Sequence, residues 1–262
     1  MKTKKTAKII IGNWKMNPLT LKDAESLFGT VAKNISKIKN TQIVICPPFL
    51  YIEKLKKLSK KINLGAQNAF LENVGAFTGE VSPDMLENIG VKYVILGHSE
   101  RRTPSTGGGE TNELINKKIK SALGAGLVPI VCVGESERDE SHSYFNLVKN
   151  QIEECLAGIS KNLISKIIVA YEPVWALSST LNRRDAIAAD SLEMSIFIKK
   201  VLSDKFGSKT ELPRMIYGGS VNEKTALDFL QNGGVDGLLP GKASLDAKKF
   251  VQIINIAENL AK

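Results

Sequence analysis

Short apolar runs alternate with longer amphipathic segments along the whole chain. The runs are rich in isoleucine, valine and leucine, and this continuous apolar character is typical of strands buried on both faces of a parallel sheet. They predict strands at Ile9–Gly12, Gln42–Cys46, Ile62–Ala66, Tyr93–Leu96, Val128–Val133, Ile167–Tyr171, Met215–Tyr217 and Gly237–Leu239.

In the segments between these runs, apolar side chains recur every three or four residues, which is the period of an amphipathic helix. The apolar faces consist of Ala24, Leu27, Phe28, Val31 and Ile35, then Ile115, Ile119 and Ala122, then Met194, Ile198 and Val201, and finally Phe250, Ile253, Ile254 and Ala257. Eight strands, each followed by a helix, predict one α/β domain over residues 1–262, a (β/α)8 barrel with a parallel eight-stranded core. An open doubly wound sheet is the alternative, but it favours a Gly-x-Gly-x-x-Gly loop that Gly12–Asn17 does not contain.

Polar residues follow the predicted strands at their C-terminal ends. The strand at Ile167–Tyr171 stops before Pro173, which lacks an N–H for the ladder, so Glu172 would project from the tip of a core strand. Comparable positions after the first, fourth, seventh and eighth strands are held by Asn13 and Lys15, His98, Gly218-Gly219-Ser220, and Gly241-Lys242. In a (β/α)8 barrel these strand ends all face one mouth, where chemistry takes place.

The side chains predicted at this mouth suit proton transfer beside an oxyanion. A carboxylate such as Glu172 can act as a base, and amide, lysine and histidine groups can stabilise the negative charge that results. Glycine turns let backbone N–H groups approach an anion, and barrels often hold phosphate with the loops after strands seven and eight. Taken singly, Lys15 is also explained as a surface lysine, His98 as a structural histidine and Gly218-Gly219 as a plain turn. Their joint placement favours an active site.

Composition and charge narrow the class of protein. The chain has 43% hydrophobic and 24% charged residues, as soluble globular proteins do, and no apolar run approaches a membrane span. Ile9–Ile11 is too short for the core of a signal peptide. The net charge of +9 comes from scattered lysines, which favours a solvated surface that attracts anionic substrates over a nucleic-acid site. Three cysteines without metal-ligand spacing predict reduced thiols in a cytoplasmic protein that has no metal.

Five motifs together resemble the triosephosphate isomerase family. They are Asn13-x-Lys15, Gly75–Glu80, Gly97–Arg102, Tyr171–Ala176 and Tyr217–Val221, in the family's order and at close to its spacing. The resemblance runs from the first strand to the last helix. It implies a TIM barrel that interconverts dihydroxyacetone phosphate and D-glyceraldehyde 3-phosphate in glycolysis and gluconeogenesis, without a cofactor or a metal.

The same resemblance implies roles for individual residues. Glu172 would take a proton from the carbon next to the carbonyl and return it to the neighbouring carbon. His98 would shuttle protons between the substrate oxygens, and this family is known for keeping that histidine neutral at a helix N-terminus while a loop closes over the site. A helical turn at Ser99–Arg102 would serve here. Lys15 and Asn13 would stabilise the charge on the enediolate.

The loop Gly75–Glu80 resembles the family's long loop after the third strand, which enters a neighbouring subunit. Thr78 would then reach Asn13 and Glu100 of that subunit, and Glu100 would also support the lysine of its own chain. The resemblance therefore implies a homodimer, and a mobile surface loop is the alternative. Glu135 and Trp175 resemble the pair that steadies the open lid.

The departures from the family pattern fall on the segments that hold phosphate and close the site. The phosphate-binding residues implied by the resemblance are Ser178, Ser220, Gly241 and Lys242. The lid, Leu177–Asp185, has no glycine, and Ser178 retains an N–H but resists a positive φ. The turn Pro240-Gly241-Lys242 has one glycine where the family usually has two. A short insertion that includes Gly107–Gly109 is predicted to be a harmless extension.

These departures leave two functions from different classes. The first is a working isomerase with a rebuilt lid, slower than the family norm because binding of the phosphate normally drives closure. The second is a phosphate-ligand binder or scaffold that has lost turnover. A barrel isomerase for a larger phosphosugar is disfavoured by the close match of the motifs at His98 and Glu172.

Overall fold

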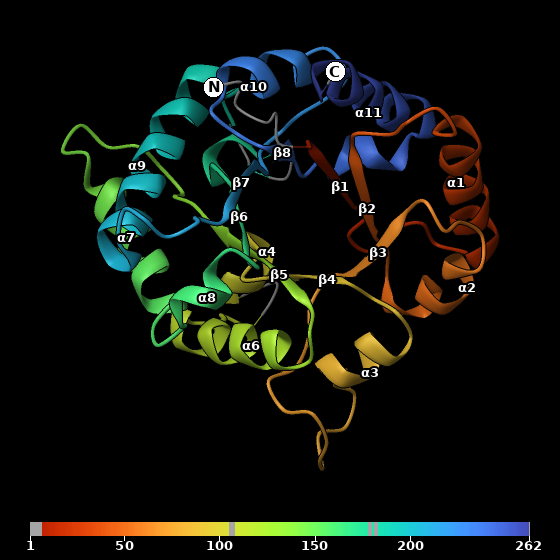
Figure 1. The fold of residues 1–262 in the computed structure, drawn as a ribbon, viewed down its shortest axis with the longest axis horizontal. Helices are drawn as coiled ribbons and strands as arrows, with labels where there is room; N and C mark the ends of the chain where they lie inside the picture. Colours follow the sequence, from red (N-terminus) through yellow and green to blue (C-terminus); the bar gives the residue numbers. More distant parts are fainter. Residues whose placement is uncertain (1–6, 105–107, 178–179, 181–182, 262) are drawn as a thin grey trace.

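The protein is described by a computed structural model that covers residues 7–104, 108–177, 180 and 183–261. Parallel strands close into a barrel in which each strand pairs with its neighbours in the chain and the last pairs with the first (Figure 1). The strands are β1 (Ile9–Asn13), β2 (Gln42–Cys46), β3 (Asn63–Ala66), β4 (Tyr93–Leu96), β5 (Val128–Val133), β6 (Ile168–Tyr171), β7 (Arg214–Tyr217) and β8 (Gly237–Leu238). The predicted (β/α)8 barrel is confirmed.

Helices form a ring around this barrel (Figure 1). The α-helices are α1 (Leu21–Asn34), α2 (Ile52–Lys56), α3 (Pro83–Asn88), α4 (Ser99–Arg102), α6 (Asn112–Gly124), α7 (Ser143–Cys155), α8 (Lys161–Ile164), α9 (Ala188–Phe206), α10 (Ala226–Asn232) and α11 (Ala247–Ala261). Short 3₁₀ turns are η1 (Phe49–Tyr51), η2 (Val174–Ala176) and η3 (Lys242–Leu245). Side-chain oxygens of Thr20, Ser82 and Thr111 cap α1, α3 and α6, which explains where these helices begin.

The core has two layers because successive side chains of a strand point to opposite faces. In β1, Ile9 and Ile11 belong to the cluster that fills the barrel, whereas Ile10 packs in the layer between strands and helices. The apolar faces predicted for the helices supply the other side of this outer layer, with Phe28 and Phe250 fully buried. Both faces of each strand are therefore apolar, as the continuous runs in the sequence indicated.

The predicted strand ends agree with the structure to within one residue. β8 is shorter than predicted, since Leu239 lies beyond the ladder although its N–H still donates to the Tyr217 oxygen at 2.8 Å. Gly237 is required where β8 meets β1, because a Cβ there would lie 2.0 Å from the Ile9 carbonyl oxygen. None of the helices within the described ranges is both long enough and apolar enough to cross a membrane.

Candidate active site

Glu172 follows the last residue of β6 at the C-terminal mouth of the barrel. Its N–H donates to the Val133 oxygen at 2.8 Å, so the backbone stays tied to β5 as the strand ends. The side chain is 2% exposed, and its Oε2 accepts the Ser99 N–H at 3.2 Å. Its Oε1 is buried and has no hydrogen-bond partner within the described part of the chain. A buried carboxylate oxygen without a donor is uncommon and marks a candidate functional group.

His98 lies opposite that free oxygen, at the N-terminal cap of α4. Its Nδ1 accepts the N–H of Glu100 at 3.2 Å, so in the neutral ring the proton is assigned to Nε2. The Nε2 atom is 3.4 Å from Oε1 of Glu172. The helical turn predicted at Ser99–Arg102 is confirmed, and it directs the N–H side of the imidazole toward the carboxylate.

The arginines of α4 fasten this turn to the barrel. Arg102 donates from Nε to the Gly97 oxygen at 2.7 Å and from Nη2 to the Cys132 oxygen at 3.0 Å. Arg101 donates from Nε to Glu110 at 2.5 Å. Gly97 has a φ of +69°, which only glycine adopts readily, and this allows the sharp change from β4 into the turn. The segment Gly97–Arg102 therefore fixes the position of the imidazole.

Asn13 and Lys15 reach the same mouth from the end of β1. Lys15 has a φ of +51°, and two contacts hold this unusual backbone: its N–H donates to Asn13 Oδ1 at 3.0 Å, and its oxygen accepts from Gln67 at 2.8 Å. Strained backbone of this kind is concentrated at functional sites. The ammonium of Lys15 lies 2.5 Å from Oε1 of Glu100, which sits two residues after His98.

Two glycine turns come close to these side chains. A Cβ on Gly218 would lie 2.9 Å from Cγ of Glu172, and one on Gly241 would lie 3.5 Å from Cε of Lys15. Among the described residues, no acceptor is found for the backbone N–H groups of Ser220, Gly241 and Lys242. Unpaired N–H groups beside a lysine can receive an anion.

A buried cluster anchors the first half of the lid. Glu135 is fully buried, and its Oε1 accepts from Trp175 Nε1 and Tyr171 OH, both at 2.8 Å, and from Arg138 Nε at 3.1 Å. Burial and the neighbouring Glu135 carboxylate raise the pKa of Tyr171 well above its usual value, so its hydroxyl remains a donor. The predicted contact between Glu135 and Trp175 is present. The sequence analysis did not identify Arg138 as part of this cluster, although its position three residues after Glu135 could have indicated an ion pair between them.

The far end of the lid carries two arginines that were also missed. Arg183 donates from Nη1 to Ser220 Oγ at 3.0 Å, and the guanidinium carbon of Arg184 lies 4.2 Å from the centre of the Trp175 ring. Ser178 and most of the lid between Leu177 and Arg183 lie outside the described residues, as does Gly107 of the insertion. Gly108 and Gly109 have φ values of +79° and +70°, consistent with a turn that glycine permits.

Cys132 lies close to the Glu172 carboxylate. Burial, reinforced by the charge of Glu172, raises the pKa of this thiol well above its usual value, so it packs as an uncharged side chain. Within the described ranges, no group of three or more histidine, cysteine, aspartate or glutamate side chains is placed to hold a metal ion.

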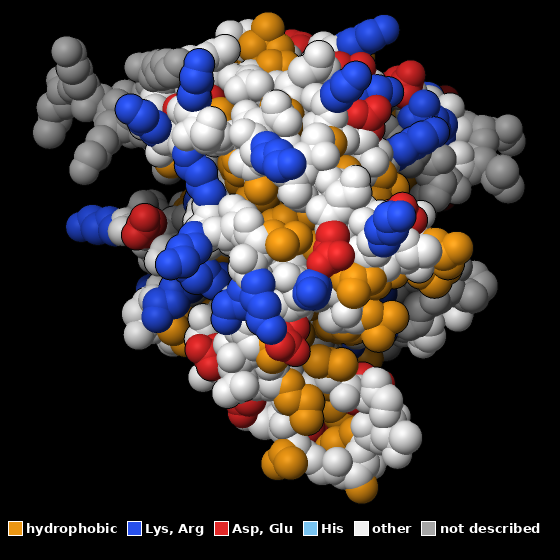
Figure 2. All heavy atoms as spheres, turned by 90° about the vertical axis from the view of Figure 1, so that its right-hand side faces the viewer, with side chains coloured by type: hydrophobic (Ala, Val, Ile, Leu, Met, Phe, Trp, Pro, Cys, Tyr) orange, Lys and Arg blue, Asp and Glu red, His pale blue; other side chains and the backbone are white. Residues whose placement is uncertain are grey.

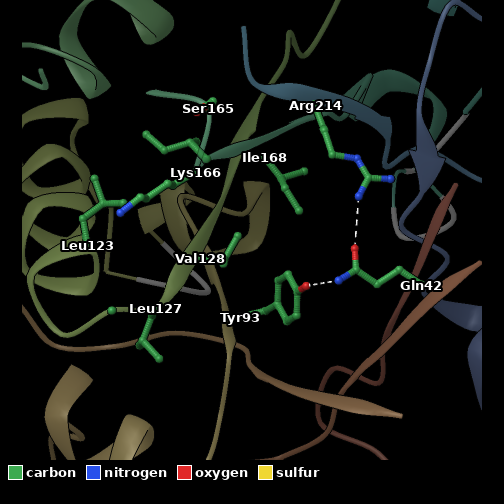
Figure 3. Close-up of a pocket in the computed structure, with 11 residues that line it drawn as sticks. Gln42, Tyr93, Leu123, Leu127, Val128, Ser165, Lys166, Ile168 and Arg214 are labelled. Atoms are coloured by element: carbon green, nitrogen blue, oxygen red, sulfur yellow. Dashed lines mark hydrogen bonds between the residues drawn. The ribbon is translucent and has the colours of Figure 1, made fainter. Parts of the chain in front are cut away.

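A cavity of about 230 Å³ lies at the opposite end of the barrel, among the first residues of several strands (Figure 3). Arg214 donates from Nη1 to Gln42 Oε1 at 3.0 Å, and the amide of Gln42 donates to the Tyr93 hydroxyl (Figure 3). Val128 and Ile168 add apolar surface. Gln42, Tyr93 and Arg214 bond to one another here, and Nε of Arg214 is left without a partner among the described residues. The C-terminal mouth is the end at which barrels carry their chemistry.

Comparison with known proteins agrees with this geometry. The family model described as triosephosphate isomerase matches residues 8–257. The chain belongs to the triosephosphate isomerase family. It therefore interconverts dihydroxyacetone phosphate and D-glyceraldehyde 3-phosphate as an intramolecular oxidoreductase, a reaction of glycolysis. Neither the comparisons nor the described residues favour the alternative of an inactive binder or scaffold.

Individual relatives are similar over nearly their whole length. The triosephosphate isomerase of Dehalococcoides mccartyi is 43% identical over 258 residues, which cover 97% of this chain and 98% of the relative. That of Thermoanaerobacter pseudethanolicus is 42% identical, covering 94% of this chain and 98% of the relative. A crystal structure of the Bartonella henselae enzyme superposes with a TM-score of 0.82 at 33% identity, covering 95% of this chain and 98% of the other.

Proposed function

We propose that Glu172 is the base that moves the proton in this isomerisation. The observation that carries this assignment is its Oε1, which is buried, unpartnered within the described residues, and 3.4 Å from His98 Nε2. The carboxylate takes the proton from the carbon next to the carbonyl. The electrons of that C–H bond form the C=C bond of the enediolate, and the π electrons of the carbonyl move onto its oxygen. The same carboxyl group then returns the proton to the neighbouring carbon.

The negative charge that this step creates is stabilised by three side chains, those of His98, Lys15 and Asn13. The neutral imidazole of His98 donates from Nε2 to the oxygen that becomes negative and moves a proton between the two oxygens of the enediolate. The Lys15 ammonium and the Asn13 side chain stabilise the same charge. Glu100 positions the ammonium, a role supported by the distance of 2.5 Å between its Oε1 and Lys15 Nζ.

The substrate phosphate binds at the turns after β7 and β8. The unpaired N–H groups of Ser220, Gly241 and Lys242 support this assignment, as does the closeness of Gly241 to Lys15. Ser178 is assigned to the same site from the family resemblance alone. Loops after strands seven and eight hold phosphate in many barrels.

The enzyme works as a homodimer whose sites are completed by the loop Gly75–Glu80 of the other subunit. This loop projects beyond the ring of helices, and Thr78 is exposed on it (Figure 1). Figure 2 shows apolar side chains gathered around the projecting segment. Exposed apolar residues of the segment between β3 and β4 are Val74, Phe77 and Met85, and Met16, Leu19 and Leu50 are exposed after β1 and β2. Met16 and Leu19, which are 93% and 92% exposed, follow Lys15 directly, so a subunit seated there would reach the active site.

The remaining assignments concern the whole protein. The chain forms one domain over residues 1–262 in the cytoplasm, and its three cysteines, all free and buried, are consistent with a reducing compartment. It needs no cofactor or metal and has no nucleic-acid or membrane partner. Dialysis against a chelator should leave turnover unchanged, and a loss restored by a divalent ion would contradict this.

The assignment of the base is tested with Glu172→Gln, which keeps the shape of the side chain but cannot accept the proton. We expect kcat for D-glyceraldehyde 3-phosphate to fall by about 10²- to 10⁴-fold, the usual contribution of a general base. Exchange of the substrate C–H with solvent deuterium, followed by NMR, should fall in parallel. A variant that isomerises and exchanges at the parent's rate would remove Glu172 from the mechanism.

The dimer is tested with Thr78→Arg, which places a bulky charge at the tip of the loop. Light scattering should report a monomer, and kcat should fall because the neighbouring site loses its support. A variant that remains dimeric with full activity would argue against this interface.

A further inference from the structure

Two consecutive arginines at the end of the lid face different neighbours. Arg184 lies over the Trp175 ring at 4.2 Å, so its guanidinium is occupied by the buried cluster that anchors the lid. Arg183 contacts the turn after β7 instead, where its Nη1 donates to Ser220 Oγ at 3.0 Å. The two side chains therefore have separate environments, although they are adjacent in sequence.

Ser220 belongs to the turn that lies over the reacting centre. Two residues before it, Gly218 passes so close to Glu172 that a Cβ would lie 2.9 Å from the carboxylate's Cγ. The backbone N–H of Ser220 has no acceptor among the described residues. A guanidinium in contact with Ser220 Oγ is consequently placed at the phosphate end of the substrate site.

The guanidinium of Arg183 retains capacity for a ligand. Both of its contacts in the described structure use Nη1, to Ser220 and to Asp185 Oδ1 at 3.2 Å. The Asp185 side chain is 81% exposed, so solvent screens that pair and it competes weakly with a dianion. A guanidinium has five N–H donors arranged in a planar fork that matches the geometry of phosphate oxygens.

We propose that Arg183 binds the substrate phosphate directly and adds a charge to a site otherwise built from backbone N–H groups. This inference rests on the proposed phosphate site at Ser220, Gly241 and Lys242. Through its contact with Ser220, Arg183 links the residues just before α9 to the turn after β7.

The test compares Arg183→Gln and Arg183→Lys with the parent on two substrates, D-glyceraldehyde 3-phosphate and D-glyceraldehyde, which lacks the phosphate. For Arg183→Gln we expect kcat/KM on the phosphorylated substrate to fall by about 10- to 100-fold, and kcat/KM on D-glyceraldehyde to stay within about twofold. Arg183→Lys keeps the charge without the planar fork, so its loss should be intermediate. The Kd of inorganic phosphate, measured by titration calorimetry, should rise about tenfold for Arg183→Gln.

Lys224→Gln is the control, and it removes a positive charge from the segment between β7 and α10 that also contains Ser220. Lys224 is exposed, and its ammonium forms no ion pair with the described residues, so both substrates and phosphate should behave as with the parent. Equal losses on the two substrates would assign Arg183 a structural role in the lid and overturn the proposal. So would an unchanged Kd of phosphate. A separate variant tests the proposed phosphate site itself. Ser220→Pro removes the N–H of that site, so an unchanged Kd of phosphate for this variant would show that the site is wrongly placed.

Discussion

Replacing Gly218 with alanine tests whether the end of β7 sets the position of the Glu172 carboxylate, the proposed base. The new methyl group would lie 2.9 Å from Cγ and 3.4 Å from Oε1 of Glu172, whereas ordinary van der Waals contact begins near 3.4 Å. Glu172 must therefore move by about 0.5 Å or tilt away from His98. Because a displacement of about 1 Å can cost about 10²-fold in rate, we expect kcat to fall by about 10- to 100-fold.

The backbone at Gly218 does not require glycine, since its φ is outside the left-handed region, so the variant should fold. Unfolding in urea should show a loss of about 1–3 kcal/mol, the usual effect of overpacking. Gly29→Ala is the matched control, because a Cβ there meets no atom within 4 Å and should stabilise α1 by about 0.5–1 kcal/mol without changing kcat. A Gly218→Ala enzyme with the parent's kcat would refute the claim that this turn positions the carboxylate.

Three further predictions concern stability, each measured by urea unfolding. Gly237→Ala should lose about 3 kcal/mol or more, because its Cβ would lie 2.0 Å from the Ile9 oxygen and force β8 from β1; a loss below about 1 kcal/mol would contradict this. Glu135→Gln should lose about 2–3 kcal/mol, since three donors share its buried oxygen, and an unchanged midpoint would be evidence against the cluster. Burial raises the pKa of Glu258, but the N–H groups of Lys39 and Asn40 outweigh it and the pKa is lowered. The carboxylate therefore stabilises the fold above its unfolded pKa of about 4.3, and the gap between parent and Glu258→Gln should close as pH falls through the folded value, not widen.

The barrel could be predicted from the sequence because its strands are buried on both faces. Continuous apolar runs such as Ile9–Ile11 that alternate with amphipathic segments are typical of strands covered on both faces, and strand order follows from the alternation with helices. Glu172 and His98 could be placed at one mouth because parallel strands deliver all their C-terminal ends to one side. The fold could therefore be inferred from the periodicity of apolar residues, and the place of the candidate site from the polar residues that follow the strands.

Contacts that depend on the path of a loop could not be predicted in this way. Nothing in the order Asn182-Arg183-Arg184-Asp185 indicates that one arginine lies over Trp175 while its neighbour reaches Ser220. The positive φ of Lys15 could not be predicted either, because lysine does not favour a positive φ. These features are fixed by the packing around them.

The chain of hydrogen bonds through Gln42, Tyr93 and Arg214 has a consequence for dividing the molecule. Gln42 and Tyr93 come from the first four strands, whereas Arg214 comes from the last four. In a fragment that ends after β4, the side-chain oxygen of Gln42 would lose its donor. In the complementary fragment, Arg214 would lose Gln42 as an acceptor. Each half-barrel should therefore be unstable when expressed alone. Co-expressed halves should fold only when they associate and form the hydrogen bonds between Gln42, Tyr93 and Arg214 again.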